Sequence, residues 1–316
     1  MKKVAPLAIF TYNRLEHTKR TVEALKANLL AMDSQLFIFS DGPKNEKDYL
    51  DIENLRNYLK TITGFKSVKI FENKENKGLA PSLISGINYI FEEHDTIIVF
   101  EDDIISSPLT LEFLNDCLEI YKNDKNVGMI HGHIETIANL PSLFFGANSG
   151  CLGWATWKRA WQEVNFDGSY LLNEIQNMHK EKEFDLGGAY PYMNMLKKQI
   201  AGKNSSWAVR MYASFFLKNI LTLYPGKSYV QHIGFDSGTH CTGLEKPTKI
   251  DGKIEATENV AKRIPIEINH EAKKKLRHFY RKRQKYSLFF FKQELVKKRN
   301  LFKTFLKKIK NDFQTS

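Results

Sequence analysis

The 316 residues contain only three cysteines, Cys117, Cys151 and Cys241, which lie far apart in the sequence. A disulfide framework or a cysteine-based zinc site needs an even or closely spaced set, so neither is expected. The sequence also has no run of about 18 apolar residues, so no membrane-spanning helix is expected. Its first apolar stretch ends at Thr11 without a small-residue cleavage site, and we interpret it as a strand instead of a signal peptide. These absences favour a protein of the reducing cytosol.

A glycine-rich loop after the first expected strand is also missing, which argues against a nucleotidyltransferase that holds a triphosphate there. Basic and aromatic residues alternate near the C-terminus, but no recognised nucleic-acid-binding motif accompanies them, so no nucleic-acid partner is expected. The composition, 42% hydrophobic and 26% charged residues, is typical of a globular protein with a substantial core.

The positive charge of the chain is concentrated at one end. Residues 262–316 carry 18 lysines and arginines against 4 aspartates and glutamates, whereas the whole chain has 47 against 36. The first 261 residues are therefore slightly acidic. The two parts present surfaces of different charge to a partner.

The first 135 residues alternate between short apolar runs and segments with helical periodicity. This alternation predicts parallel βαβ units, and the near-continuous apolar strands indicate a sheet covered on both faces. We therefore expect an α/β fold with a mixed, mostly parallel central sheet. The expected strands are 6–12, 36–42, 67–73, 96–103 and 127–134, and the expected helices are 14–30, 48–62, 79–92 and one from about 108.

From about residue 140 the pattern changes to glycine- and tryptophan-rich segments that are typical of loops and short strands. Two or three helices are expected between residues 170 and 217. Residues 242–269 are polar and are interpreted as a linker. Residues 270–316 lack proline and glycine and place apolar residues at three- to four-residue steps between lysines, which predicts a basic amphipathic helical extension.

This extension fits more than one partner. A basic amphipathic helix can lie on an anionic membrane, where each nearby lysine or arginine adds about 1 kcal/mol of attraction. It can equally pack on the protein's own body or on a second subunit. We favour the membrane, and hence a cytoplasmic protein attached peripherally to the inner face of the membrane.

Polar residues gather where the expected strands end. They are Thr11, Asn13 and Arg14 after the first strand, Asp41 after the second, and Lys77 and Gly78 before the third helix. Ligands of an open parallel sheet bind at the carboxyl ends of its strands, and a helix N-terminus there can face an anion. This rim therefore offers carboxylates and cationic side chains for a divalent cation and a phosphate.

The fourth strand ends in three adjacent carboxylates, Glu101, Asp102 and Asp103. Adjacent carboxylates repel one another and are costly to bury unless a cation or a hydrogen bond compensates them. Mg²⁺ and Mn²⁺ prefer oxygen ligands, commonly one or two carboxylates plus substrate phosphates. The triplet therefore fits a metal site, although a solvated acidic turn would have the same sequence.

Five motifs in order, FTYNR, SDGP, NKGLAPSLISGI, VFEDDI and GCLGWATWKRAW, resemble glycosyltransferases with the GT-A fold. The resemblance is to family 2-type bacterial sugar transferases and, more closely, to N-acetylglucosaminyltransferase I. It covers roughly residues 5–241. It implies a Rossmann-like GT-A domain over 1–241, with a nucleotide-sugar-binding part over 1–135 and an acceptor part over 136–241.

The resemblance implies roles for the donor side of the rim. Asp41 would hold the nucleotide base, Arg14 would contact the donor phosphates and Asp102 would lie near the ribose. The remaining donor-side residues are Thr11, Asn13, Lys77 and Gly78.

The resemblance also implies a metal and an acceptor side. Asp103 would bind the Mn²⁺ or Mg²⁺ that bridges the diphosphate, and His240 could complete the metal shell. Gly153, Trp154 and Trp207 would wall the sugar and acceptor pocket.

The general base that an inverting transfer needs departs from the family pattern. The family's Trp-Asp-Asp-Trp segment corresponds here to SSWAVRMY, in which no carboxylate follows Trp207. Asp236, in a glycine-bounded loop, and Asp185 are the candidates that replace it.

We therefore expect a metal-dependent, inverting glycosyltransferase that moves a sugar from a nucleotide diphosphate sugar to a glycan or lipid-linked acceptor. The expected setting is bacterial surface polysaccharide or lipid-linked glycan synthesis. Two alternatives stay open. One is a metal-dependent nucleotidyltransferase, and the other is a non-catalytic nucleotide-sugar-binding scaffold at the membrane.

Overall fold

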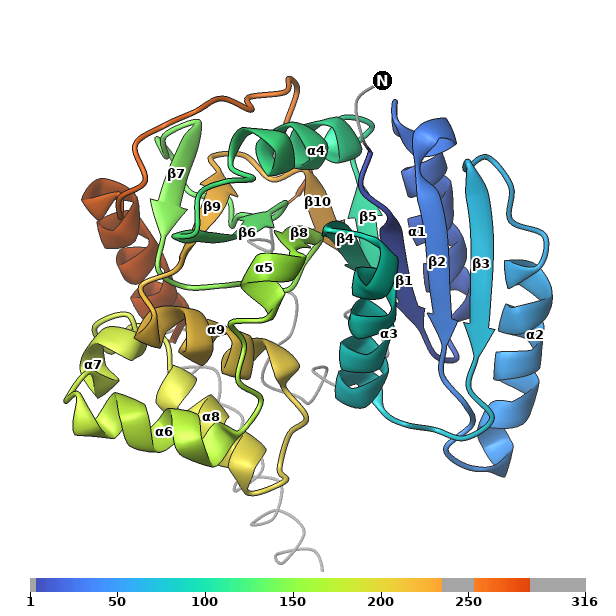
Figure 1. Cartoon of the computed structure of the whole chain (residues 1–316), viewed down its shortest axis with the longest axis horizontal. Coiled ribbons are helices and arrows are strands. Elements are labelled where there is room, and N and C mark those ends of the chain that lie inside the picture. Colours follow the sequence, from blue (N-terminus) through green and yellow to red (C-terminus); the bar gives the residue numbers. More distant parts are fainter. Residues whose placement is uncertain (1–3, 235–252, 285–316) are drawn as a thin grey trace, which may run out of the picture.

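The computed structural model describes residues 4–234 and 253–284 (Figure 1). Its first part confirms the predicted alternation of strands and helices. Neighbouring strands pair in parallel, with β1 between β2 and β4 and with β3 beside β2. The elements are β1 (Leu7–Thr11), α1 (Leu15–Lys26), β2 (Gln35–Ser40), α2 (Tyr49–Leu59), β3 (Ser67–Glu72), α3 (Leu79–Glu93) and β4 (Thr96–Glu101), with short 3₁₀ turns at Ala31–Asp33 and Glu46–Asp48.

Helices cover both faces of these four strands, as their apolar sequences predict. The chain moves from β1 to β2 to β3 in one direction and returns past them to β4. Right-handed crossovers therefore put α1 and α2 on one face and α3 on the other (Figure 1). On the α3 side, Gly86 lies directly against the rings of Phe10 and Phe39.

The second half of the sheet is mixed. The eight strands follow the order β3-β2-β1-β4-β8-β6-β9-β7, and only β8 and β7 run antiparallel to their neighbours. Since β8 is antiparallel to both β4 and β6, the carboxyl ends of β4 and β6 lie at the same edge of the sheet. These strands are β6 (Val127–His131), β7 (Leu143–Gly146), β8 (Trp154–Trp157) and β9 (Leu221–Pro225), preceded by α4 (Thr110–Ile120) and interrupted by α5 (Lys158–Trp161).

A second, two-stranded sheet forms beside the acidic triplet. β5 (Ile104–Ser106) pairs antiparallel with β10 (Val230–His232), so that His232 lies opposite Ile104. The next residue, Ile233, donates its backbone N–H to the carbonyl of Asp103 at 2.9 Å. The pairing brings a segment more than 120 residues distant in sequence to the end of β4.

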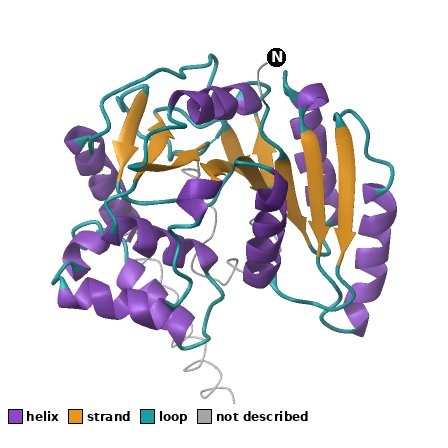
Figure 2. Ribbon diagram, viewed as in Figure 1, coloured by secondary structure: helices purple, strands orange, loops and turns teal. Residues whose placement is uncertain are grey.

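A helical layer extends from one side of the sheet (Figure 2). It has its own apolar cluster, in which Phe184 stacks on Tyr212 at 4.5 Å between ring centroids. The predicted two or three helices are four: α6 (Gly168–Asn177), α7 (Glu181–Phe184), α8 (Tyr192–Ile200) and α9 (Trp207–Leu217).

Residues 253–269, within the predicted linker, run along the body of the protein. The hydroxyl of Tyr229 donates to the Glu258 carbonyl at 2.6 Å, and that of Tyr121 donates to the Lys262 carbonyl at 3.1 Å. Arg263 pairs with Asp124 at 2.8 Å. This strap leads to an isolated parallel bridge at the edge strand β7.

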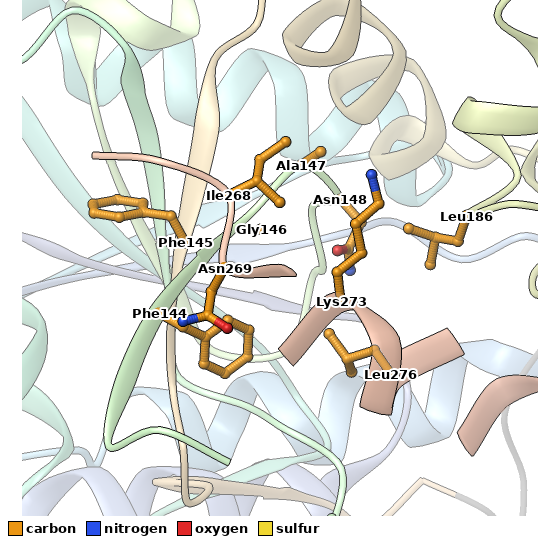
Figure 3. Close-up of a pocket in the computed structure, with 10 residues that line it drawn as sticks. All are labelled: Phe144, Phe145, Gly146, Ala147, Asn148, Leu186, Ile268, Asn269, Lys273 and Leu276. Carbon is orange, nitrogen blue, oxygen red and sulfur yellow. The ribbon is translucent and has the colours of Figure 1, made fainter. Parts of the chain in front are cut away.

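A helix over residues 270–284 follows the strap and packs on the sheet edge. Ala272 and Leu276 are buried against Phe144 and Tyr224. Figure 3 shows the small cavity left beside this contact, where Asn148 and Leu276 are among the lining residues. Its volume of about 10 Å³ has room for about one water molecule, so the helix is well packed. The first third of the predicted basic extension is thus a helix bound to the body.

None of the helices within residues 4–234 and 253–284 combines the length and the apolar character needed to cross a bilayer. Asp236 and His240 lie outside the described residues, as does the extension beyond residue 284.

Candidate functional site

The acidic triplet lies at the carboxyl edge of the sheet, where β4 ends. The strand stops at Glu101, and Asp102 and Asp103 form the turn to β5. The two aspartates are buried, at 4% and 6% exposure. A solvated acidic turn would be exposed, so their burial means that they need compensating partners.

Arg14 supplies that compensation from the start of α1. Its guanidinium contacts the carboxylate of Asp102 and lies 2.9 Å from Oδ2 of Asp103. Burial alone would lower the pKa of Arg14, but the charges of the two aspartates outweigh it and hold the pKa above its ordinary value. The buried Nη1 of Arg14 has no hydrogen-bond partner among the described residues. The guanidinium therefore keeps a donor for a further acceptor.

His232, at the end of β10, contacts the same carboxylate oxygen of Asp103 as Arg14 does. Its Nε2 lies 3.1 Å from Oδ2 of Asp103. Next to it, a side chain at Gly234 would collide with Asp103 and Arg14, so this close approach of the backbone requires glycine. His232 was not predicted as a site residue, because only the β5–β10 pairing brings it to the triplet.

The three carboxylates differ in their pKa values. Burial, reinforced by Asp103 and Asp102, raises the pKa of Glu101 to about 8, and burial raises that of Asp102 to about 6 despite the charge of Arg14. Burial would also raise the pKa of Asp103, but the hydrogen bond to His232 and the charges of His232 and Arg14 lower it. Asp103 is therefore the member of the triplet best suited to stay ionised beside a cation.

Asp41 is buried at the end of β2 and binds the loop that leads to α3. Its Oδ1 accepts hydrogen bonds from the backbone of Gly42 and Lys77 and from Asn73, and its Oδ2 accepts from Asn76 and from the backbone of Gly78. The N-terminus of α3, predicted to face an anion, faces this carboxylate. Asp41 thus organises the loop, and its predicted contact with a nucleotide base stays a prediction.

The other predicted donor-side residues surround this loop. The amide of Asn13 donates to the Asp48 carboxylate at 3.3 Å, and the hydroxyl of Tyr12 donates to the same carboxylate. These two hydrogen bonds hold the segment before α2. Thr11 is buried, and its hydroxyl has no hydrogen-bond partner within the described part of the chain. Lys77 is exposed. These side chains line the same edge as Arg14 and Asp41, since they follow parallel strands.

The predicted acceptor tryptophans are buried in a stack. Trp154, at 0% exposure, lies 5.2 Å from Trp207 and 6.3 Å from Trp161 between ring centroids. Gly153, just before this stack, has a φ of +57°, and a side chain there would collide with Val230 and crowd Phe100. Trp154 and Trp207 are thus core side chains, and Trp154 directly follows the loop 150–153. Their contact with an acceptor stays a prediction.

This loop lies next to the end of β4, because Trp154, which follows the loop, pairs with Val99 in the antiparallel contact of β8 with β4. Burial, together with the charges of Glu101 and Asp103, raises the pKa of the Cys151 thiol well above its ordinary value. His131 holds the loop by a hydrogen bond, because its Nε2 accepts the backbone N–H of Leu152 at 3.2 Å. The glycine-rich segment and the carboxylates therefore belong to one site.

Asp185, one of the two predicted bases, has a structural task. Its Oδ1 accepts the backbone N–H of Met193 at 2.7 Å at the start of α8. Burial raises its pKa, against the effect of the backbone hydrogen bonds from Met193 and Tyr192. Its role as a base stays a prediction, as do those of Asp236 and His240 outside the described residues.

The residues at the triplet fit a divalent metal in part. Among the described residues there is no group of three or more histidines, cysteines, aspartates or glutamates arranged to hold a metal ion. Asp103 and His232 nevertheless converge as one oxygen and one nitrogen donor, a combination that suits Mn²⁺ when substrate phosphates complete the coordination.

No protein-family model matches the sequence, and no curated protein matches it either. Among solved structures, the chain is similar to S. aureus TarS, with 12% identity, a TM-score of 0.28 and coverage of 40% of this chain. The match spans only 21% of the TarS chain. It is also similar to the mannosyltransferase PcManGT from Pyrobaculum calidifontis in complex with GDP-Man and Mn²⁺, with 8% identity, a TM-score of 0.39 and coverage of 69% of this chain and 73% of that chain. At these TM-scores the likenesses carry no argument about activity.

Proposed function

We propose that this chain transfers a sugar from a nucleotide diphosphate sugar to an acceptor hydroxyl with the help of a divalent metal ion. The observation that carries the proposal is the setting of Asp103, whose carboxylate lies between Arg14 and His232 at the carboxyl edge of the sheet. A buried carboxylate with an imidazole and a guanidinium beside it offers the groups that a metal-bound diphosphate requires.

Asp103 and His232 would hold the metal ion, with His240 as a further candidate. When bound, such an ion adds positive charge that stabilises a departing diphosphate. Arg14 would contact the donor phosphates through the donors that the aspartates leave available. Asp102, paired with Arg14, would keep the guanidinium in place and lie near the ribose.

The remaining predicted residues would shape the donor and acceptor surfaces. Asp41, with Lys77 and Gly78, would form the wall against the nucleotide base, and Thr11 and Asn13 would line the rim between the base and the phosphates. On the acceptor side, Gly153, Trp154 and Trp207 would support the loop that faces the sugar.

We further propose that the segment beyond residue 284 attaches the protein to an anionic membrane. Residues 285–316 carry 9 lysines and arginines against 2 acidic residues, with apolar residues between them. An acceptor in surface polysaccharide or lipid-linked glycan synthesis would suit this location.

The donor site is tested by thermal unfolding with UDP, GDP, ADP, CDP and dTDP, each with and without Mn²⁺. A diphosphate at 100 times its dissociation constant adds about 2.7 kcal/mol to the free energy of unfolding. We expect one diphosphate to raise the melting temperature only when Mn²⁺ is present, and this rise to disappear in Asp103→Asn.

Asp33→Asn is the matched control, because it makes the same chemical change at an exposed aspartate in the 3₁₀ turn before β2. This control should keep the full rise. If none of the diphosphates changes the melting temperature of the wild type, the donor site and the transfer reaction are both wrong. A rise that persists in Asp103→Asn would remove Asp103 from the metal site alone.

A further inference from the structure

The rim continues beyond the acidic triplet to the carboxyl end of β6. Because β4 and β6 are parallel, residues 132–135 leave the sheet at the edge that holds Asp103. Only β8 separates the two strands, so two strand spacings, roughly 10 Å, lie between their ends. A sugar whose diphosphate lies at Asp103 would extend over a distance of this order.

Glu135 is held at this part of the rim by the helix over residues 270–284. The side chain of Glu135 is 12% exposed, and its Oε1 lies 3.3 Å from Nη1 of Arg283. Two contacts hold the helix on the body. Leu276 is buried, and the side chain of Arg281 donates a hydrogen bond to the Gly187 carbonyl at 2.9 Å. In many active sites a further group orients the base, and Arg283 would orient the Glu135 carboxylate in this way.

His133 lies in the segment between the end of β6 and Glu135. It is buried, and burial together with the charges of His131, His232 and Arg283 lowers its pKa to about 3. His232 contacts Asp103, and Arg283 contacts Glu135. Residues 132–134 run beside the segment that leads to His232, because the N–H of Tyr229 donates to the Gly132 carbonyl at 2.9 Å and the N–H of Ile134 donates to Oγ of Ser228 at 3.4 Å.

Four of the other candidate carboxylates bind partners that fix them in place. Asp41 organises the loop before α3, and Asp102 and Asp103 pair with Arg14. Asp185 binds the start of α8. The partner of Glu135 is Arg283, a cation on the helix over residues 270–284.

We propose that Glu135 is the general base of the transfer and that Arg283 is its positioning residue, an assignment that rests on the proposed function. The Glu135 carboxylate takes the proton of the acceptor hydroxyl as the acceptor oxygen bonds to the anomeric carbon. The bond from that carbon to the diphosphate oxygen breaks, and the diphosphate leaves with the bonding electron pair.

The test uses the full chain and water as the acceptor. Sugar nucleotides that carry the diphosphate identified by thermal unfolding are incubated with Mn²⁺, and release of the free sugar is measured. Glu135→Gln should lower the hydrolysis rate by about 100-fold or more, as loss of a general base does, while the diphosphate still raises the melting temperature. Glu271→Gln is the matched control. It also removes a carboxylate that is paired with a cation, Lys275, in the helix that carries Arg283.

A readout specific to a base comes from chemical rescue. Azide needs no deprotonation, so it should restore turnover to Glu135→Ala and yield a glycosyl azide. If Glu135→Gln does not fold, Glu135→Asp takes its place, since it keeps the charge but moves it by one methylene. A lower rate with unchanged diphosphate binding is then expected.

Hydrolysis by Glu135→Gln at the wild-type rate would overturn the assignment, and a loss confined to Asp236→Asn would transfer the role to Asp236. A wild type that binds a diphosphate with Mn²⁺ but hydrolyses no sugar nucleotide would overturn both the transfer reaction and the role of Glu135.

Discussion

At the scale of single residues, two buried carboxylates are compensated in a similar way. Asp41 and Asp103 are both compensated by partners from a distant part of the sequence. Asp41 accepts hydrogen bonds from a loop more than 30 residues away, and Asp103 faces His232 across 129 residues. Such pairs are expensive to break, because the remaining member would be left buried without compensation.

His131 gives a prediction about pH. Its Nδ1 lies 2.7 Å from the His133 carbonyl and its Nε2 accepts from Leu152, so the ring is neutral with its proton on Nδ1. Burial lowers its pKa to about 4, below the unfolded value of about 6.5. Between these values the unfolded state binds the extra proton, so the free energy of unfolding should fall by about 1.4 kcal/mol per pH unit as pH decreases from 6.5 to 4.

Urea unfolding at pH 7.5, 6.5, 5.5 and 4.5 measures this slope. His131→Gln should make it shallower by about one proton, because glutamine does not titrate. His133, whose pKa is also lowered, keeps a residual slope in this variant. His278→Gln, at an exposed position of the helix over 270–284, should leave the slope unchanged. An identical slope in all three proteins would mean that His131 is protonated in the folded state.

At the scale of elements, the helix over residues 270–284 packs on the body of the protein and is not a detached tail. Leu276 is 4% exposed and packs with Ile134, Phe144 and Tyr224. Leu276→Ala should therefore lower the free energy of unfolding by about 2–3 kcal/mol, the cost of a cavity at a partly relaxing site. Lys274→Ala, at an exposed neighbouring position, is the control and should change it little. Equal stability of both variants in urea would show that the helix does not pack on the body.

The sequence allowed the prediction of β1 to β4 and of α1 to α3, because local patterns determine them. Apolar runs bounded by polar rims indicate strands covered on both faces. The insertion of β8 between β4 and β6 could not be predicted, since GCLGWATW has the composition of a loop and its pairing depends on distant strands.

The same difference separates the predicted and the missed site residues. Asp103 and Arg14 belong to short motifs at strand ends, so their place at the rim followed from the βαβ order. His232 and Glu135 reach the rim through the β5–β10 pairing and the contact with Arg283, which no local pattern records. Likewise, periodicity predicted the amphipathic helix of the extension but could not distinguish a partner in the protein from a membrane.

At the scale of the whole molecule, the structure divides the basic extension into two parts. The helix over 270–284 carries 7 lysines and arginines against 1 acidic residue, and its apolar face is buried on the body. The segment over 285–316 carries 9 against 2 and keeps the apolar residues that the membrane proposal requires. The two parts can therefore be separated by truncation.

Truncation after residue 284 should leave the melting temperature of the body unchanged but abolish flotation with phosphatidylserine vesicles at low salt. The reason is that charge and apolar surface must act together, with about 1 kcal/mol from each lysine or arginine near the surface in addition to apolar burial. The truncated protein also serves as the control for charge alone, because it keeps the basic residues of the helix over 270–284. Full-length protein should float less with phosphatidylcholine vesicles and less at high salt, where the attraction is screened. Equal flotation of both proteins would assign membrane attraction to the body. If neither protein floats, the membrane proposal is wrong, and a protein surface is the partner of the basic extension.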